Sequence, residues 1–256
     1  MIDNPYPKKW QDLQIGVNRI FLDVGVLSEV EKDLPTPRGS VNVDVFAIDE
    51  RSLDKINYIV ECKNWGKPIP QSVVHSFTTV MQETGANVGF IISKHGLQSG
   101  AKEYTTNTNI TGLTYLEFQQ RYFDAWWKRC FCPLVGNTAD RVLYYTEEFN
   151  WRRDEEYNEL CLEKKVLFDS LRSQYFIHSW MLAKFNHPSL MPSITADPIT
   201  NTPFSLEDFK IEILSRITPD ITWQCDTFRE LLELIIEFLT NIEEKFNSIF
   251  GRYIFD

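Results

Sequence analysis

The sequence predicts an α/β fold, in which a mixed sheet flanked by helices is followed by a mainly α-helical C-terminal domain. Short apolar or alternating segments typical of strands lie between about residues 40 and 116, and helical patterns separate the last three of them. This strand–helix–strand–helix–strand order implies parallel pairing with right-handed crossovers. Beyond about residue 117 the strand signal fades and long helical patterns replace it.

Apolar periodicity and turn residues define the elements of the first part. Apolar residues from Trp10 to Phe21 recur at three- and four-residue steps, prolines interrupt the chain after Leu34, and Gly85 is placed to end a helix. The predicted elements are a helix from Trp10 to near Gly25, a strand at 26–30, a loop at 34–40, strands at 41–48 and 58–63, a helix at 71–83, a strand at 88–93, a helix at 101–108 and a strand at 111–116.

The second part predicts three long helices, at 118–131, 155–185 and 227–250. Asp226 is a candidate N-cap for the last, and Ser205 with Asp208 resembles a capping box. A proline-bearing loop at 187–203 interrupts this half. We therefore predict a catalytic domain at 1–118 and a helical domain at 119–256, which serves partner binding, oligomerisation or regulation.

The charge distribution limits how the chain can bind nucleic acid. The net charge is −10, and non-specific DNA affinity depends mainly on Lys and Arg. Residues 1–120 carry 11 basic and 14 acidic side chains, whereas residues 121–256 carry 15 and 22. The acidic helical half is thus better suited to a protein partner or a second copy of itself than to DNA.

Composition also bears on location and on the cysteines. No run of eighteen apolar residues or N-terminal signal-like segment is present, so we expect a cytoplasmic protein without a membrane span. The five cysteines include no C-x-x-C pair, and we interpret them as reduced thiols.

Two carboxylates and a lysine form the candidate chemical centre. Asp44 lies within one predicted strand, and Glu61, Cys62 and Lys63 end the next. Because alternate residues of a strand share a face, Glu61 and Lys63 should point into one space. Charged groups in apolar strands are costly unless they are paired or bind a metal. The alternative, a surface ion pair between Glu61 and Lys63 on an edge strand, stays open on spacing alone.

The segments GSVNVDVFAID, YIVECKNW and GANVGFIISKHGLQSGAKEY, with Val74 and Phe77 between the last two, resemble in order and spacing the catalytic domain of the Mrr-like restriction endonucleases. This family is part of the PD-(D/E)xK superfamily. The resemblance covers roughly residues 40–116. It implies a restriction-endonuclease-like fold. It also implies that Asp44, Glu61 and the Cys62 carbonyl bind Mg²⁺ or Mn²⁺, and that the catalytic residues are Asp44, Glu61 and Lys63.

Two positions depart from the family pattern. Val43 stands where the superfamily name places proline, and Glu61 stands where many Mrr relatives have glutamine. The glutamate should strengthen metal binding, since Mg²⁺ prefers carboxylate oxygens.

Several neighbouring polar and aromatic residues are weaker candidates. Gln71 could bind a phosphate or a metal-bound water and His75 could take a catalytic role, but we favour a solvent-exposed position for Gln71 and a half-buried or exposed one for His75. Asp12 and Gln14 of the first helix could add a polar group to the site, a role that we do not favour. Phosphate contact and ordinary solvated charge stay equally open for Lys67, Lys94, His95 and Lys102. For Trp126 and Trp127 we favoured core packing over base stacking.

The resemblance implies a Mg²⁺-dependent deoxyribonuclease acting in restriction or antiviral defence, with DNA as substrate and a homo-oligomer or protein partner held by the helical domain. Two alternatives stay open. One is a catalytically idle nuclease fold used for DNA binding or scaffolding, and the other is a structure-selective DNA repair nuclease.

Overall fold

The computed structural model describes residues 1–186, 202–203, 205–218 and 220–255. These residues form two compact units, Met1–Arg129 and Cys130–Asp256. The functional boundary predicted after residue 118 stays a prediction. Most of the loop predicted at 187–203 lies outside the described residues.

The first unit is built on a five-stranded mixed sheet in the order β1-β2-β3-β4-β5. The strands β1 (Leu27–Thr36), β2 (Gly39–Asp49) and β3 (Ile56–Lys63) pair antiparallel. The strands β4 (Val88–Ser93) and β5 (Ile110–Thr114) continue from β3 in parallel. The predicted mixed sheet and its parallel half are therefore confirmed.

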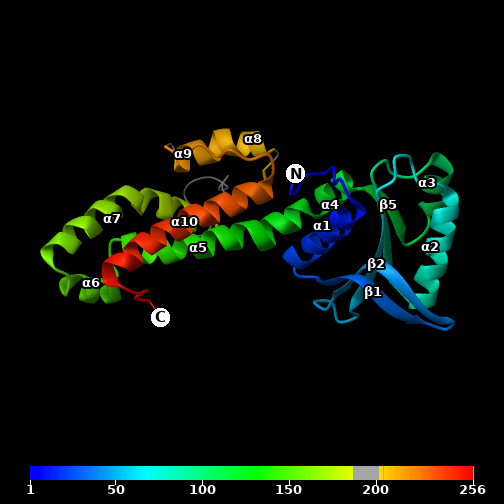
Figure 1. Ribbon diagram of the computed structural model, residues 1–256, viewed down its shortest axis with the longest axis horizontal. Coiled ribbons are helices and arrows are strands. Elements are labelled where there is room, and N and C mark those ends of the chain that lie inside the picture. The colour runs from blue at the N-terminus through cyan, green and yellow to red at the C-terminus, as the bar shows by residue number, and fades with distance from the viewer. Residues whose placement is uncertain (187–201, 204, 219, 256) are drawn as a thin grey trace. The chain divides into compact units, whose positions relative to one another are not determined.

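Helices cover both faces of this sheet (Figure 1). The crossover helices α2 (Gln71–Thr84) and α3 (Ser99–Thr105) lie on one face, and α1 (Trp10–Asp23) and α4 (Tyr115–Trp126) lie on the other. Gly85 follows α2 in the left-handed conformation, with φ 67°, which confirms the predicted helix end.

Each face has its own core. On the α2 face, Ile59, Phe77 and Ile91 are among the buried residues of one apolar cluster. On the α1 face, the Phe118 ring packs edge-on against Phe21 and Phe90, with centroids 5.5 and 5.7 Å apart. The sheet is therefore packed against apolar side chains on both faces.

The N-terminal part of the sheet differs from the sequence prediction. The strand predicted at 26–30 extends to Thr36 and β2 begins at Gly39, so the loop predicted at 34–40 is wrong for residues 34–36 and 39–40. Pro35 pairs with Ser40 within this ladder. Proline fits there because β1 is an edge strand, where a missing N–H can face solvent.

The second unit is helical, as predicted. Its helices are α5 (Cys132–Thr146), α6 (Trp151–Asn158), α7 (Leu162–Ala183), α8 (Leu206–Phe209), α9 (Ser215–Ile217) and α10 (Phe228–Phe250), with π-helical turns at Trp127–Phe131 and Lys210–Leu214. Within the described residues, no helix is long and apolar enough to cross a membrane.

Three helix predictions for the C-terminal half need correction. The single helix predicted at 155–185 is two helices, α6 and α7, and α5 had not been predicted. The N-cap of α10 is Thr227 and not Asp226, because Thr227 accepts a hydrogen bond from the Glu230 N–H. The Ser205 cap is confirmed, since its hydroxyl accepts from the Asp208 N–H.

Aromatic stacking and one ion pair join α5 to α10. The Tyr145 and Phe246 rings stack with centroids 4.9 Å apart, and the Tyr145 hydroxyl donates to Asn247 at 2.6 Å. Arg141 forms two hydrogen bonds to Glu243, at 2.6 and 2.9 Å. Such paired contacts fix the register of the two helices.

Candidate active site

The candidate site lies where β2 and β3 separate. Their pairing ends at Val45 opposite Val60, and Asp44 and Glu61 are the next residue on each strand. Beyond this point β3 continues to pair with β4 as far as Lys63. The end of the antiparallel ladder therefore leaves room for side chains between the two strands.

The Asp44 carboxylate fills this opening. Its Oδ2 atom accepts a hydrogen bond from the Cys62 backbone N–H at 2.6 Å. Its Oδ1 atom accepts one from the Gln14 side-chain amide of α1 at 2.9 Å. A carboxylate held by two donors keeps a single orientation, so Asp44 is preorganised.

Glu61 and Lys63 share one face of β3, as predicted. The Lys63 ammonium forms an ion pair with Glu61 and lies 3.9 Å from Asp44 Oδ2. The side chains of all three residues are 22–27% exposed, so they are partly desolvated but can still be reached from solvent. The structure thus brings Asp44, Glu61 and Lys63 together.

The electrostatics keep Lys63 charged. Partial burial disfavours its ammonium form, but the hydrogen bond to Glu61 and the charges of Glu61 and Asp44 outweigh that effect and raise the pKa of Lys63. An ammonium with a raised pKa acts as a hydrogen-bond donor and a positive charge, and it is a poor proton acceptor.

Cys62 contributes backbone atoms to the site. Its side chain is buried, and burial raises the pKa of the Cys62 thiol well above its usual value. In an extended strand the N–H and C=O of one residue point to the same neighbour. Because the Cys62 N–H reaches Asp44, its carbonyl also points toward the gap between β2 and β3.

A cavity of about 250 Å³ opens beside Glu61 and Lys63. Its other wall is α2, which contributes Ser72, Val73, Ser76, Phe77 and Val80. The site therefore combines charged groups from β3 with a wall of hydroxyl and apolar side chains.

Gln14 belongs to the site, although the sequence pattern alone did not favour a role for it there. It is 3% exposed and contacts Asp44 directly. A signal was present in the sequence, because Gln14 precedes Val17 by three residues and Phe21 by seven. That spacing places a polar side chain within the buried stripe of α1.

The other weak candidates lie outside the group formed by Asp44, Glu61 and Lys63. Asp12 caps α1 by accepting from the Lys9 N–H at 3.2 Å. Gln71 and His75 are exposed and contact each other at 3.2 Å. The remaining candidates are exposed basic residues or buried aromatic ones: Lys67, Lys94, His95 and Lys102 are exposed, and Trp126 and Trp127 are buried.

The donor set is suited to a hard divalent cation. Among the described residues, no group of three or more His, Cys, Asp or Glu side chains could enclose a metal. Asp44 and Glu61 offer two carboxylates, and Cys62 offers a carbonyl oxygen. Mg²⁺ is commonly held by one or two carboxylates and completes its shell with water and substrate phosphate. The residues present therefore fit Mg²⁺ or Mn²⁺ better than a metal needing a closed protein cage.

Comparison with known proteins agrees with this geometry. Residues 9–121 match the family model Mrr_cat, which is described as "Restriction endonuclease". The resemblance drawn from the sequence is thereby confirmed, and the match supports a restriction-endonuclease-like nuclease. It includes Gln14 and the whole of the site.

One solved structure also shows similarity. It is titled "Crystal Structure of Protein of Unknown Function AF1548" and aligns with 17% sequence identity and a TM-score of 0.34. The alignment covers 40% of this chain and 55% of that chain, so this chain spans about half the length of the structure that it matches. No curated protein matches the chain.

Proposed function

We propose that the chain is a Mg²⁺-dependent endonuclease that hydrolyses phosphodiester bonds of DNA. The observation that carries this proposal is the convergence of Asp44, Glu61 and Lys63 at the open end of the β2–β3 ladder. Phosphodiester hydrolysis requires a positioned nucleophilic water and neutralisation of negative charge in the transition state. Two carboxylates and an ammonium within one partly desolvated site meet those requirements.

Each residue has a defined task in this proposal. Asp44, Glu61 and the Cys62 carbonyl hold the cation, which supplies an activated water and neutralises phosphate charge when bound. Lys63 orients that water and stabilises negative charge on the phosphate oxygens. Gln14 holds the Asp44 carboxylate in its orientation.

Glu61 has two possible partners in this scheme. In the structure its carboxylate is paired with Lys63. Glu61 would offer the same oxygens to a bound cation, and the Lys63 ammonium would then be available to stabilise charge on the phosphate oxygens. Before the cation and substrate arrive, the Lys63 ammonium therefore offsets only part of the negative charge of Glu61 and Asp44.

We propose DNA as the substrate because residues 9–121 match a family model described as a restriction endonuclease. Restriction of foreign DNA or another form of antiviral defence, in the cytoplasm, is the biological setting that we infer. The helical unit would then act in assembly or control.

We further propose that the helical unit pairs with a second copy of itself through the outer face of α7, defined as Leu162, Val166, Phe176 and Ile177. These apolar side chains are 78, 64, 38 and 49% exposed. With about 3.6 residues per turn, they lie opposite the side of α7 that is buried within the unit. A helix with apolar residues on two opposite sides needs a second partner.

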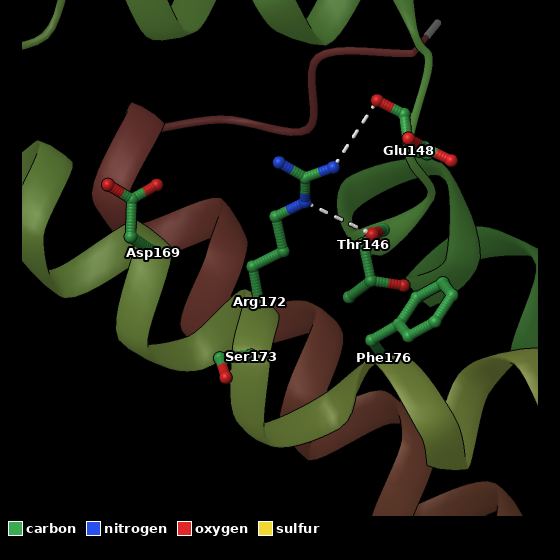
Figure 2. Close-up of a pocket in the computed structure, with 6 residues that line it drawn as sticks. All are labelled: Thr146, Glu148, Asp169, Arg172, Ser173 and Phe176. Carbon is green, nitrogen blue, oxygen red and sulfur yellow. Dashed lines mark hydrogen bonds between the residues drawn. The ribbon is translucent and has the colours of Figure 1, made fainter.

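The charges beside the outer face favour a second copy as that partner. A pocket of about 480 Å³ adjoins it, and Figure 2 shows the Arg172 side chain extending from α7 between Asp169 and the loop at Glu148. Arg172 donates to the carbonyl oxygens of Thr146 and Glu148 at 3.1 and 3.3 Å. Since this surface carries both signs of charge, a two-fold axis can bring Asp169 of one copy near Arg172 of the other. Two active sites in one dimer would allow both DNA strands to be cut.

Plasmid cleavage tests the proposed function. Supercoiled plasmid and phage DNA would be incubated with wild-type protein and with Asp44→Ala and Lys63→Ala variants, in Mg²⁺, Mn²⁺ or EDTA. Lys55→Ala is a matched control, because Lys55 is exposed and pairs with Glu50. We expect metal-dependent nicking or cutting that Lys55→Ala retains and the two site variants lose by at least about a hundredfold. Undiminished cutting by Asp44→Ala and Lys63→Ala would place the activity elsewhere and refute the assignment.

A further inference from the structure

Three aromatic side chains are exposed beside the candidate active site. Tyr6 is 66% exposed, Trp10 46% and Trp65 40%. The sequence had placed Trp10 on the apolar side of the first helix, but the structure turns it to solvent. Single exposed apolar residues are ordinary, whereas three large exposed rings near one site are typical of a ligand-binding surface.

The first link between these rings and the site is Asn64, the residue after Lys63. Its side-chain amide donates to the carbonyl oxygens of Pro7 and Lys8, at 3.3 and 3.2 Å. The N-terminal segment that carries Tyr6 therefore lies against the end of β3. Trp65 follows Asn64 directly, so both aromatic segments meet at this contact.

The second link runs through α1. Trp10 precedes Gln14 by four residues, and side chains at this spacing lie on the same side of a helix. Gln14 is the residue that donates to Asp44. Trp10 is thus one helical turn away from a direct contact with the catalytic carboxylate.

The N-terminal segment is anchored as well as exposed. Ile2 is fully buried, the Asp3 N–H donates to Gln119 at 2.9 Å, and the Tyr115 hydroxyl contacts the Asp3 carboxylate at 3.4 Å. These contacts hold the start of the segment that leads into α1, and the Asn64 hydrogen bonds to Pro7 and Lys8 hold its end. The rings are therefore presented on a built surface, which lowers the entropy cost of binding.

Positive charge accompanies the rings. Lys8 and Lys9 lie between Tyr6 and Trp10 in the sequence, Lys67 follows Trp65 by two residues, and all three lysines are exposed. In a chain with a net charge of −10, such a local group of lysines is complementary to a polyanion. Lysines that neutralise phosphates next to rings that stack on bases are the combination found in single-strand binding sites.

We propose that this aromatic rim, defined as Tyr6, Trp10 and Trp65 with Lys8, Lys9 and Lys67, binds unpaired nucleotides of the DNA strand next to the phosphate that is cleaved. The inference rests on the proposed nuclease function and specifies its substrate: DNA with unpaired or extruded bases near the cleaved bond. In an intact duplex, neighbouring base pairs cover the base faces, and only their edges face the grooves. Exposed rings can therefore stack on bases only where the duplex is opened.

Binding of labelled oligonucleotides in EDTA tests the proposal without cleavage. The probes are a thymidine oligonucleotide of about 15 nucleotides and a blunt duplex of the same length, each followed by fluorescence anisotropy at low salt. The proteins are the full chain, a Trp10→Ala/Trp65→Ala double variant, and Trp151→Ala. Trp151 is the matched control, since it is 75% exposed on α6 of the second unit.

We expect the wild type and Trp151→Ala to bind the single strand more tightly than the duplex. The double variant should lose about tenfold or more in single-strand affinity and keep its duplex affinity. A Lys8→Ala/Lys9→Ala variant should instead weaken both probes and reduce the salt dependence of binding. Quenching of tryptophan fluorescence by the oligonucleotide should be smaller in the Trp10→Ala/Trp65→Ala variant than in Trp151→Ala.

Equal binding of single strand and duplex, or an unchanged single-strand affinity in the double variant, would overturn the proposal. Tighter binding of a uridine ribo-oligonucleotide than of the thymidine probe would overturn its DNA part. Binding of neither probe would also overturn it, because the rings would then have no nucleic-acid role. A chain that binds single strands but cuts no DNA would refute the nuclease function alone, because binding is measured without metal.

Discussion

Gln14 donates a 2.9 Å hydrogen bond to Asp44, which joins helix α1 to the centre of the candidate active site. The other oxygen of Asp44 is held by the Cys62 N–H. Thus the orientation of one carboxylate depends on a helix and a strand that are far apart in the sequence. Residues that hydrogen-bond a metal-binding carboxylate commonly influence the affinity of the site for the metal.

We predict that Gln14→Ala lowers DNA cleavage by about 10- to 100-fold and raises the Mg²⁺ concentration needed for half-maximal cleavage. The amide no longer orients Asp44, and a partly buried carboxylate oxygen loses its donor. The measurement is cleavage rate against Mg²⁺ concentration. Ile15→Ala serves as control, since Ile15 is 57% exposed on the same helix. A loss of stability with no change in the Mg²⁺ midpoint would reduce Gln14 to a structural role.

We predict that Glu61→Gln weakens metal binding by about tenfold or more while the fold is retained. The amide keeps the shape of the side chain but removes its negative charge. The site then keeps only one charged ligand, Asp44, and Lys63 loses its ion-pair partner. Isothermal titration with Mn²⁺ measures the affinity directly. Glu50→Gln is the matched control, because Glu50 is an exposed carboxylate in an ion pair with Lys55. Equal Mn²⁺ affinity in wild type and Glu61→Gln would exclude Glu61 as a ligand.

We predict that a Val166→Glu/Ile177→Glu variant is monomeric under conditions where the wild-type protein is a dimer. Two carboxylates on the outer face of α7 would be buried without partners in the proposed interface. Sedimentation equilibrium measures the mass of each species. Asn241→Asp adds a carboxylate at an exposed position of a different helix, α10, and should stay dimeric. A monomeric wild type, or a dimer that the double variant leaves intact, argues against the proposed interface.

We predict that Arg153→Met destabilises the second unit by about 2 to 4 kcal/mol. Arg153 is 1% exposed, and its guanidinium donates to the carbonyl oxygens of Tyr145 and Glu147 and to the Asp154 carboxylate. The carbonyl groups of Tyr145 and Glu147 lie at the C-terminal end of α5, and in the variant they lose a charged hydrogen-bond donor. Urea denaturation followed by circular dichroism measures the effect. Arg216→Met, at an exposed position, should change the midpoint little, and a similar shift in both variants would contradict the prediction.

Local patterns were sufficient wherever the burial of a residue follows from its neighbours in the sequence. The α2 helix and its end at Gly85 agree with the periodicity, and so do the parallel strands β3, β4 and β5. Strand alternation also placed Glu61 and Lys63 on one face. These features depend on period and on glycine conformation, which are properties of short segments.

Helix α5 shows where local patterns were insufficient. It carries Pro133 in its first turn and Gly136 one turn later, and both residues weaken a helix prediction. Proline is tolerated there because the first N–H groups of a helix have no intrahelical partner. Gly136 is required by packing, since a Cβ atom at this position would lie 2.3 Å from the Asn186 side chain. Only the folded unit shows that contact.

By itself, the sequence determined the α/β and helical halves and the parallel pairing in the sheet, and it predicted the motif residues Asp44, Glu61 and Lys63. Only the tertiary structure decided that Gln14 faces Asp44 and that Trp10 faces solvent, whereas the core packing favoured for Trp126 and Trp127 is confirmed. The physical reason is that hydrophobic and helical periodicity assigns a side chain to one side of its own element. Which groups lie on that side depends on elements distant in the sequence, and their packing selects the partners.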